Sequence, residues 1–291
     1  MNIWPDCIPC ILKMSLDIAR DTLEEDGDIK SFFARVLALG PMKGDMWDIT
    51  APEIIRDIWQ ILEDKTGIKD PLHEKKRIQN NIALKVYPYA KESVNKSNEP
   101  FQEALKWSIS GNFIDIMAGV NDIHRDDIIA RVMGMELNDQ AMEEFKKRIK
   151  KSKKVVYLCD NCGEIVFDRL FGETLRDTLG IDIVFVVRSV PVLNDATMED
   201  AFYIGLNSVG EVMENGIKEP LPGLLLNKAS KDLKRLIDDA GLVISKGGGN
   251  FDTLFNDDSL RGRVTFLLQA KCQPYTLLHG VKKGDLIVNN F

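Results

Sequence analysis

Oxygen-bearing side chains of the kind that bind divalent cations occur in two short segments of this chain. Asp160 and Asn161 stand in the segment LCDNCGEIVFD, and Asn194 and Asp195 stand in VPVLNDAT. Carboxylate and amide oxygens are hard ligands that suit an octahedral ion such as Mg²⁺ or Mn²⁺. The three histidines lie far apart in the sequence, so a histidine-built metal site is not expected. The two segments therefore favour an oxygen-rich metal site.

A lysine followed by three glycines provides groups that could bind an anion. Lys246 precedes Gly247, Gly248 and Gly249 in SKGGGN, and a helix is expected to begin near Phe251. The lysine supplies a positive charge, and glycine amides at a helix entry can cradle a phosphate. The segment lacks the Gly-Lys-Ser/Thr ending of a P-loop, so it is a weak signal alone. Beside a bound cation, it predicts a phosphate site.

Cysteines offer a competing chemistry. Cys159 and Cys162 flank the Asp-Asn pair with Cys-x-x-Cys spacing, but a carboxylate between them opposes thiolate formation and disfavours a thioredoxin-like role. Cys7 and Cys10 form a second pair, too distant in sequence for an ordinary zinc module. A disulfide, structural or metal role of this second pair stays open. Cys272 is expected to lie in the core.

The second half of the chain contains short apolar runs that alternate with helical patterns. Continuous apolar strands between helices predict a mostly parallel sheet covered on both faces. In such sheets, ligands bind beyond the carboxyl ends of the strands. The expected strands are Val155–Cys159, Ile181–Val187, Gly241–Ser245, Val264–Ala270 and Asp285–Asn289.

Polar residues follow four of these strands. Each of them alone could be a helix cap or a turn former. Their predicted position on one sheet edge favours a common site over these local roles. They are Asp160 and Asn161 after the first strand, Arg188, Asn194 and Asp195 after the second, Lys246 and its glycines after the third, and Lys271 after the fourth.

Residues 1–150 are expected to form an all-helical domain, because apolar positions recur every three or four residues. Thr50, Pro52 and Glu53 provide a capping box and a first-turn proline for one of these helices. The predicted domain boundary lies within Lys147–Lys154. Residues 151–291 should form a three-layer α/β/α, Rossmann-like domain that binds metal and phosphate, while the helical domain contributes to the edge of the site.

Composition restricts the partners. The 45 acidic and 38 basic residues give a net charge of -7, without a basic block that would track a phosphate backbone, so nucleic acid is not expected. No apolar run has the ~18 residues of a membrane span, and no secretory signal precedes the first helix. We expect a cytoplasmic protein that binds a small molecule; a homo-oligomer is left open.

Several of these motifs together resemble the damage-control phosphatase family, and the match follows the family's order over nearly the whole chain. The stand-alone microbial branch, which carries an amino-terminal cysteine pair, is the most similar. The resemblance implies a metal-dependent phosphatase that hydrolyses small phosphometabolites, such as sugar phosphates, that are damaged or in excess. It also implies one divalent ion, Mg, Mn, Co or Ni. The motifs are CIPC, SGNFIDIMAG, CDNCGEIVFD, RSVPVLNDAT and ISKGGGNFDTL.

The resemblance also assigns site residues. Asp160, Asn161 and Asp195 fall on the family's metal ligands, in agreement with the strand-end argument. Asn112 and Asp115 of GNFID fall at the site edge as substrate or metal-water contacts. Lys246 also matches the family's lysine and is expected to neutralise the phosphate. The strand-end argument adds the other expected substrate contacts, which are Arg188, Gly247, Gly248 and Gly249.

In the expected mechanism, a water held by the metal attacks the phosphate. Asp160 or Asp195 orients this water, and Lys246 with the glycine amides stabilises the transition state. A nucleophilic role for Asp160, as in haloacid dehalogenase phosphatases, is less favoured because their pattern requires an aspartate at the position of Cys162.

Other protein classes compete with a phosphatase. The same sheet edge could serve a non-catalytic phosphometabolite-binding protein, and the cysteine pairs could serve a redox or metal protein. A methyltransferase is disfavoured because LCDNCGE lacks a glycine-rich first turn.

Overall fold

The computed structural model describes residues 1–111 and 125–291 and is built around one six-stranded sheet. The strand order is β3-β2-β1-β4-β5-β6. All neighbouring pairs are parallel except β5 and β6, which are antiparallel. The predicted mostly parallel sheet is therefore confirmed. The strands are β1 Lys154–Leu158, β2 Asp182–Val187, β3 Glu211–Glu214, β4 Leu242–Lys246, β5 Val264–Gln269 and β6 Leu286–Asn290.

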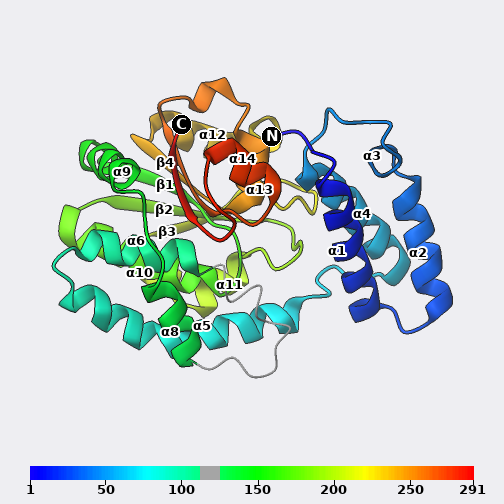
Figure 1. Ribbon diagram of the computed structural model, residues 1–291, viewed down its shortest axis with the longest axis horizontal. Coiled ribbons are helices and arrows are strands. Elements are labelled where there is room, and N and C mark those ends of the chain that lie inside the picture. Colours follow the sequence, from blue (N-terminus) through cyan, green and yellow to red (C-terminus); the bar gives the residue numbers. More distant parts are fainter. Residues whose placement is uncertain (112–124) are drawn as a thin grey trace.

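Helices cover both faces of this sheet, as the alternating pattern predicted (Figure 1). One face packs against amino-terminal helices and α10, and the other packs against the later helices α12, α13 and α14. The helices on the first face are α5 His73–Lys96, α6 Pro100–Ser110, α9 Asp139–Lys151 and α10 Glu164–Leu179, with α8 Arg125–Met133 beside them. Those on the second face are α12 Lys231–Asp239, α13 Gly247–Leu254 and α14 Gln273–His279.

The first helices form a group of their own at one end of the molecule (Figure 1). Their buried apolar side chains form a separate cluster, which also takes in Val192 from the loop after β2. Thr50 and Glu53 form the predicted capping box at the start of α4. The amino-terminal helices thus divide between two apolar cores, and the domain boundary near residue 150 stays a prediction. This group comprises α1 Cys7–Thr22, α2 Asp26–Ala38, α3 Gly40–Lys43 and α4 Ala51–Thr66.

Short helical elements interrupt several of the remaining connections. Helix α11 covers Met198–Tyr203, and single 3-10 turns cover Leu206–Ser208, Leu226–Lys228 and Asp258–Leu260. β3 was not predicted because it has no apolar run: none of its side chains is fully buried. A second difference concerns α13, which begins at Gly247 and not near Phe251, so the three glycines form its first turn.

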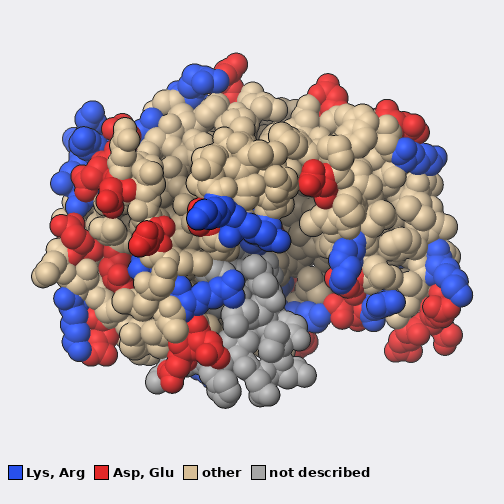
Figure 2. All heavy atoms as spheres, in the orientation of Figure 1, with Lys and Arg blue, Asp and Glu red and all other residues tan. Residues whose placement is uncertain are grey.

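The surface carries charges of both signs. Lys and Arg side chains are interspersed with Asp and Glu side chains over the face shown in Figure 2. Within the described residues, no helix has both the length and the apolar composition needed to cross a membrane.

Candidate metal and phosphate site

Two loops meet beyond the carboxyl ends of β1 and β2. The β1 loop carries Asp160 and Asn161, and the β2 loop carries Asp195. The amide of Ala196 donates to the carbonyl of Asp160 at 2.8 Å, and Asn161 and Asp195 form an antiparallel bridge. These backbone contacts bring together the three side chains that the sequence predicted as metal ligands.

The three side chains are nearly inaccessible to solvent. Asp160, Asn161 and Asp195 are 6%, 7% and 2% exposed. The Asn161 amide donates to Asp160 Oδ2 at 3.0 Å. Arg188 Nε donates to Asp195 Oδ2 at 2.6 Å, and Arg188 Nη2 lies 3.5 Å from Asp160 Oδ1. Burial and the neighbouring Asp195 carboxylate raise the pKa of Asp160 well above its ordinary value, against the opposite effect of Arg188.

This donor set fits a divalent cation. Two buried carboxylates face one guanidinium, and a second cation nearby would relieve the repulsion that raises the pKa of Asp160. The third oxygen donor is the side-chain amide of Asn161. In the described residues, no three histidine, cysteine, aspartate or glutamate side chains form a metal-binding group. The residues suited to a metal are therefore Asp160, Asn161 and Asp195.

A cavity of about 210 Å³ opens onto these three candidate ligands. Residues at the start of α4 line it together with residues of α13, β5 and α14, so an amino-terminal helix reaches the edge of the cavity. Its lining residues are Ala51, Pro52, Ile55, Asp160, Asn161, Leu193, Asn194, Asp195, Pro222, Gly248, Gly249, Asp252, Gln269, Lys271 and Tyr275.

Positive groups reach this cavity from two elements. Lys271 follows β5 and lines the cavity; its charge acts to lower the pKa of Asp160, which places it near the ligands. Gly248 and Gly249 line the cavity from the first turn of α13, where backbone amides lack intrahelical partners. Sequence reasoning placed Lys271 on this sheet edge but omitted it from the site residues.

Gly247 is not part of the cavity lining and lies against Asp160, one of the candidate metal ligands. Its φ is +77°, and a Cβ at this position would lie 1.8 Å from Asp160 Oδ2. Both the backbone conformation and the space therefore require glycine.

Lys246 points away from the cavity into the protein. It is completely buried, and its ammonium donates to Glu164 Oε1 at 2.8 Å, to Asp168 Oδ1 at 2.6 Å and to the carbonyl of Ser108 at 3.0 Å. Among the described residues, neither Lys246 nor Arg188 belongs to the cavity lining. Both predicted phosphate contacts are instead paired with carboxylates behind it.

The carboxylates around Lys246 connect the ligand loop to the core. Asp168 also accepts hydrogen bonds from Tyr157 and Ser108, both at 2.7 Å. Glu164 accepts a hydrogen bond from the amide of Asn161 at 3.4 Å, and burial raises its pKa to about 7 against the effect of Lys246. The sequence signal for this cluster was the four-residue spacing of Glu164 and Asp168 on one helix face.

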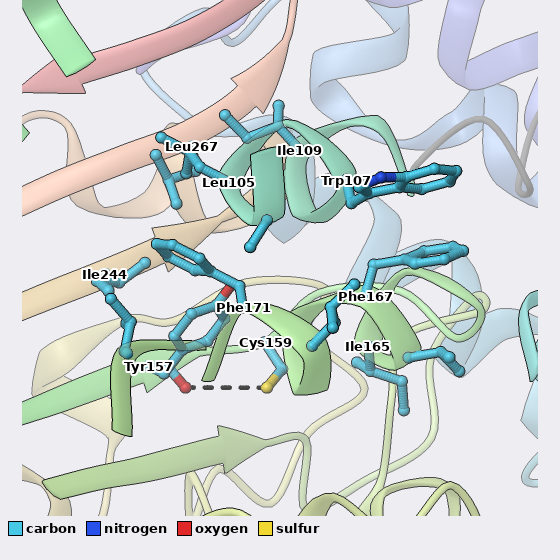
Figure 3. Packing of buried hydrophobic residues seen from close by; sticks show 14 of the residues in the cluster. Leu105, Trp107, Ile109, Tyr157, Cys159, Ile165, Phe167, Phe171, Ile244 and Leu267 are labelled. Atoms are coloured by element: carbon cyan, nitrogen blue, oxygen red, sulfur yellow. Dashed lines mark hydrogen bonds between the residues drawn. The ribbon is translucent and has the colours of Figure 1, made fainter. Parts of the chain in front are cut away.

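The cluster is enclosed by an apolar core. Trp107 of α6 stacks on Phe167 of α10, with ring centroids 5.3 Å apart (Figure 3). Phe101 of α6 meets Phe171 of α10 edge-on at 5.5 Å. Water is therefore excluded from the face of α10 that carries Asp168.

A further acid, Asp252, lies on the cavity wall. Tyr275 donates to Asp252 Oδ1 at 3.1 Å, and burial raises the pKa of Asp252 to about 7. No sequence signal distinguished this acid from an ordinary helix residue, since it stands mid-way through α13.

The cysteines beside the ligands are packed as small apolar side chains. Cys159 and Cys162 are 1% exposed, and the Cys159 thiol donates to the carbonyl of Tyr157 at 3.8 Å (Figure 3). Burial raises the pKa of both thiols well above the usual range, which opposes a redox role. Cys272 is half-buried against the α13 side of the core, Cys7 is half-buried and Cys10 is exposed. All five thiols are free.

Two predicted site residues, Asn112 and Asp115, lie outside the described residues.

Known proteins resemble this chain over its whole length. The family model of the damage-control phosphatase ARMT1-like domain matches residues 3–287. A damage-control phosphatase of Archaeoglobus fulgidus is 35% identical over 299 residues, covering 99% of this chain and 98% of that protein. A damage-control phosphatase of Pyrococcus horikoshii is 27% identical over 293 residues, covering 99% and 97%.

The fold is also similar to a solved structure. A DUF89 family protein of Pyrococcus horikoshii superposes with a TM-score of 0.86 at 26% identity, and the match covers 100% of both chains. The family that the sequence motifs indicated is thus confirmed. By the extent of the family match and by its identity to the Archaeoglobus relative, this chain belongs to the ARMT1-like damage-control phosphatases.

Proposed function

We propose that this protein is a divalent-metal-dependent phosphomonoester hydrolase that acts on a small phosphorylated metabolite. The observation that carries the proposal is the convergence of Asp160, Asn161 and Asp195 at a cavity that also contains Lys271. Family membership supports the reaction class, and the oxygen donors support a hard ion such as Mg²⁺ or Mn²⁺, with Co²⁺ and Ni²⁺ as further candidates.

The ligand side chains have distinct tasks in this proposal. Asp160, Asn161 and Asp195 hold the ion, which when bound supplies Lewis-acid activation of the phosphate and of a water. Arg188 fixes the orientation of both carboxylates through its contacts at 2.6 and 3.5 Å. One of the carboxylates orients the attacking water by accepting a hydrogen bond from it.

The phosphate is bound by groups of α13 and of the segment that follows β5. Lys271 supplies a positive charge, and the amides of Gly248 and Gly249 donate hydrogen bonds to phosphate oxygens. Lys246 does not contact the phosphate; through Glu164, which accepts a hydrogen bond from the backbone amide of Asn161, it supports the β1 loop.

Cavity size and lining restrict the substrate. A volume of about 210 Å³ is below the ~300 Å³ at which drug-sized sites begin. Its polar groups are carboxylates, amides and a lysine, but apolar surface, to which Pro52, Ile55 and Leu193 contribute, makes up the larger part of the lining. We infer a small substrate such as a sugar phosphate, with its phosphate at the polar groups.

The test is a panel of phosphometabolites and an aryl phosphate, assayed with Mg²⁺, Mn²⁺, Co²⁺ and Ni²⁺ in parallel. Asp160→Ala should abolish hydrolysis. Lys271→Ala should weaken phosphate binding by roughly 1 to 3 kcal/mol, the contribution of a charged hydrogen bond. Lys283→Ala, which changes an exposed lysine outside the cavity lining, is the control and should be as active as the wild type.

Two results would contradict the proposal. Full activity of Asp160→Ala would exclude the assigned metal site. Tight, metal-dependent binding of a phosphometabolite without turnover of any compound would favour the binding-protein alternative, which uses the same sheet edge.

A further inference from the structure

One face of α5 carries three buried polar side chains. Lys76, Gln79 and Asn80 are 1%, 3% and 0% exposed. Their spacing of three and four residues places them on the same side of the helix. Burying a polar side chain costs free energy unless the side chain forms a hydrogen bond. The partners of these three side chains therefore indicate the role of this helix face.

The first contact reaches the β1 loop. Asn80 Oδ1 accepts a hydrogen bond of 2.7 Å from the amide of Gly163, two residues beyond the ligand Asn161. Gly163 has a φ of +77° and precedes the first residue of α10, so its peptide sets the direction in which the loop enters the helix. Asn80 therefore fixes the turn that carries Asp160 and Asn161.

The other contacts reach the β2 loop. Gln79 Oε1 accepts a hydrogen bond of 3.3 Å from the side chain of Asn194, the residue before the ligand Asp195. Lys76 Nζ lies 3.0 Å from Asp200 Oδ2 at the start of α11, where this loop ends. The carbonyl of Asn194 in turn accepts from the amide of Cys162, so the two loops are also tied to each other.

We propose that Gln79 and Asn80 of α5 are positioning residues for the metal, holding the two ligand loops in register so that Asp160, Asn161 and Asp195 converge. This inference rests on the proposed function, because it presumes that the three side chains bind an ion. The backbone near Asp195 is strained, with Leu193 at a φ of +47°. Such a conformation persists only where surrounding contacts hold it, and Gln79 provides one of them.

The test measures metal affinity independently of turnover. The full-length protein is freed of metal with a chelator and titrated calorimetrically with Mg²⁺, Mn²⁺, Co²⁺ and Ni²⁺, and the tightest ion is used for all variants. Gln79→Leu, Asn194→Leu and their double variant form one cycle. Asn80→Ala is measured alongside. Asn81→Ala is the control: this neighbouring amide on α5 is exposed and accepts from Tyr203 at 2.6 Å.

We expect Gln79→Leu and Asn80→Ala to raise the metal Kd roughly tenfold, as removal of outer-shell partners typically does. The double variant should be no weaker than Asn194→Leu, because Gln79 acts through Asn194. Asn81→Ala should keep the wild-type Kd. If Asn80→Ala does not fold, the Gln79 and Asn194 cycle decides the outcome.

Distinct results would overturn the two proposals. A wild-type protein that binds none of the four ions would remove the proposed function, and this inference with it. Two results would overturn the positioning role alone, provided that the wild type binds metal. One is an unchanged metal Kd in Gln79→Leu; the other is a double variant whose increase in Kd equals the product of the two single increases.

Discussion

Gly247 and Asp160 are in such close contact that no other residue type fits opposite the carboxylate. A Cβ added to Gly247 would lie 1.8 Å from Asp160 Oδ2, and the glycine has a φ of +77°. We predict that Gly247→Ala displaces Asp160 and reduces metal affinity and phosphatase activity by more than tenfold. The positive φ alone should cost roughly 1 to 2 kcal/mol of stability.

Gly262→Ala separates these two effects. Gly262 has a φ of +76°, but nothing lies within 4 Å of a Cβ there. This control should lose similar stability in urea unfolding while keeping its metal affinity. Equal metal affinity in both variants would show that Asp160 has room to move.

The second prediction concerns Lys246. Lys246→Met leaves Glu164 and Asp168 buried without their cation, so the free energy of unfolding should fall by about 3 to 5 kcal/mol. Urea unfolding of the metal-free protein measures this loss. For comparison, Lys13→Met breaks an exposed pair with Asp17 and should cost less than about 1 kcal/mol. If Lys246→Met kept wild-type stability and was impaired only in phosphate binding, the result would support the direct contact between Lys246 and the phosphate that the sequence predicted.

The third prediction concerns thiol reactivity. With a thiol reagent such as Ellman's, the exposed Cys10 should react first, and Cys7 and Cys272 more slowly because burial raises the pKa of each. Cys159 and Cys162 should react only after unfolding in denaturant. Mass spectrometry of the labelled peptides identifies the order. Rapid labelling of Cys162 in the native protein would reopen the redox alternative.

The fourth prediction is a pH dependence of stability. The pKa of Asp252 is raised by burial to about 7 in the folded protein and is ~3.9 in an unfolded chain. Between these values the folded state holds a proton that the unfolded state has lost, so this group's contribution to stability decreases as pH rises and levels off above about 7. Asp252→Asn should therefore gain Tm relative to the wild type across this window.

Thermal unfolding with a chelator present, from about pH 4.5 to 8.5, measures this difference. Asn retains the oxygen that accepts from Tyr275. Asp239→Asn changes an exposed aspartate and is the control: its Tm should vary with pH as that of the wild type does. A Tm difference for Asp252→Asn that does not change with pH would contradict the assigned cause.

Much of the fold followed from local patterns. Five strands lie within one residue of their expected ends, because buried parallel strands are continuous apolar runs. β3 was not predicted because this exposed edge strand has no such run. The convergence of Asp160, Asn161 and Asp195 was predictable for a related reason, since each follows a strand at the sheet edge where ligands bind.

The surroundings of the ligands were not predictable in this way. Lys246 stands at the correct edge, but whether its side chain faces the cavity or the core depends on Glu164 and Asp168 across the interior. Gln79 and Asn80 contact loops more than eighty residues further along the chain. Hydrogen bonds between distant segments leave no periodic signal in a sequence.

The stacked rings of Trp107 and Phe167 have a consequence for the history of this chain. They belong to α6 and α10, one on each side of the predicted boundary near residue 150, and lie in one continuous core. Recombination at that boundary would join surfaces that had never adapted to each other. The helical and sheet parts are therefore expected to be inherited as a unit, and chimeras of two relatives should succeed only when both rings come from the same parent.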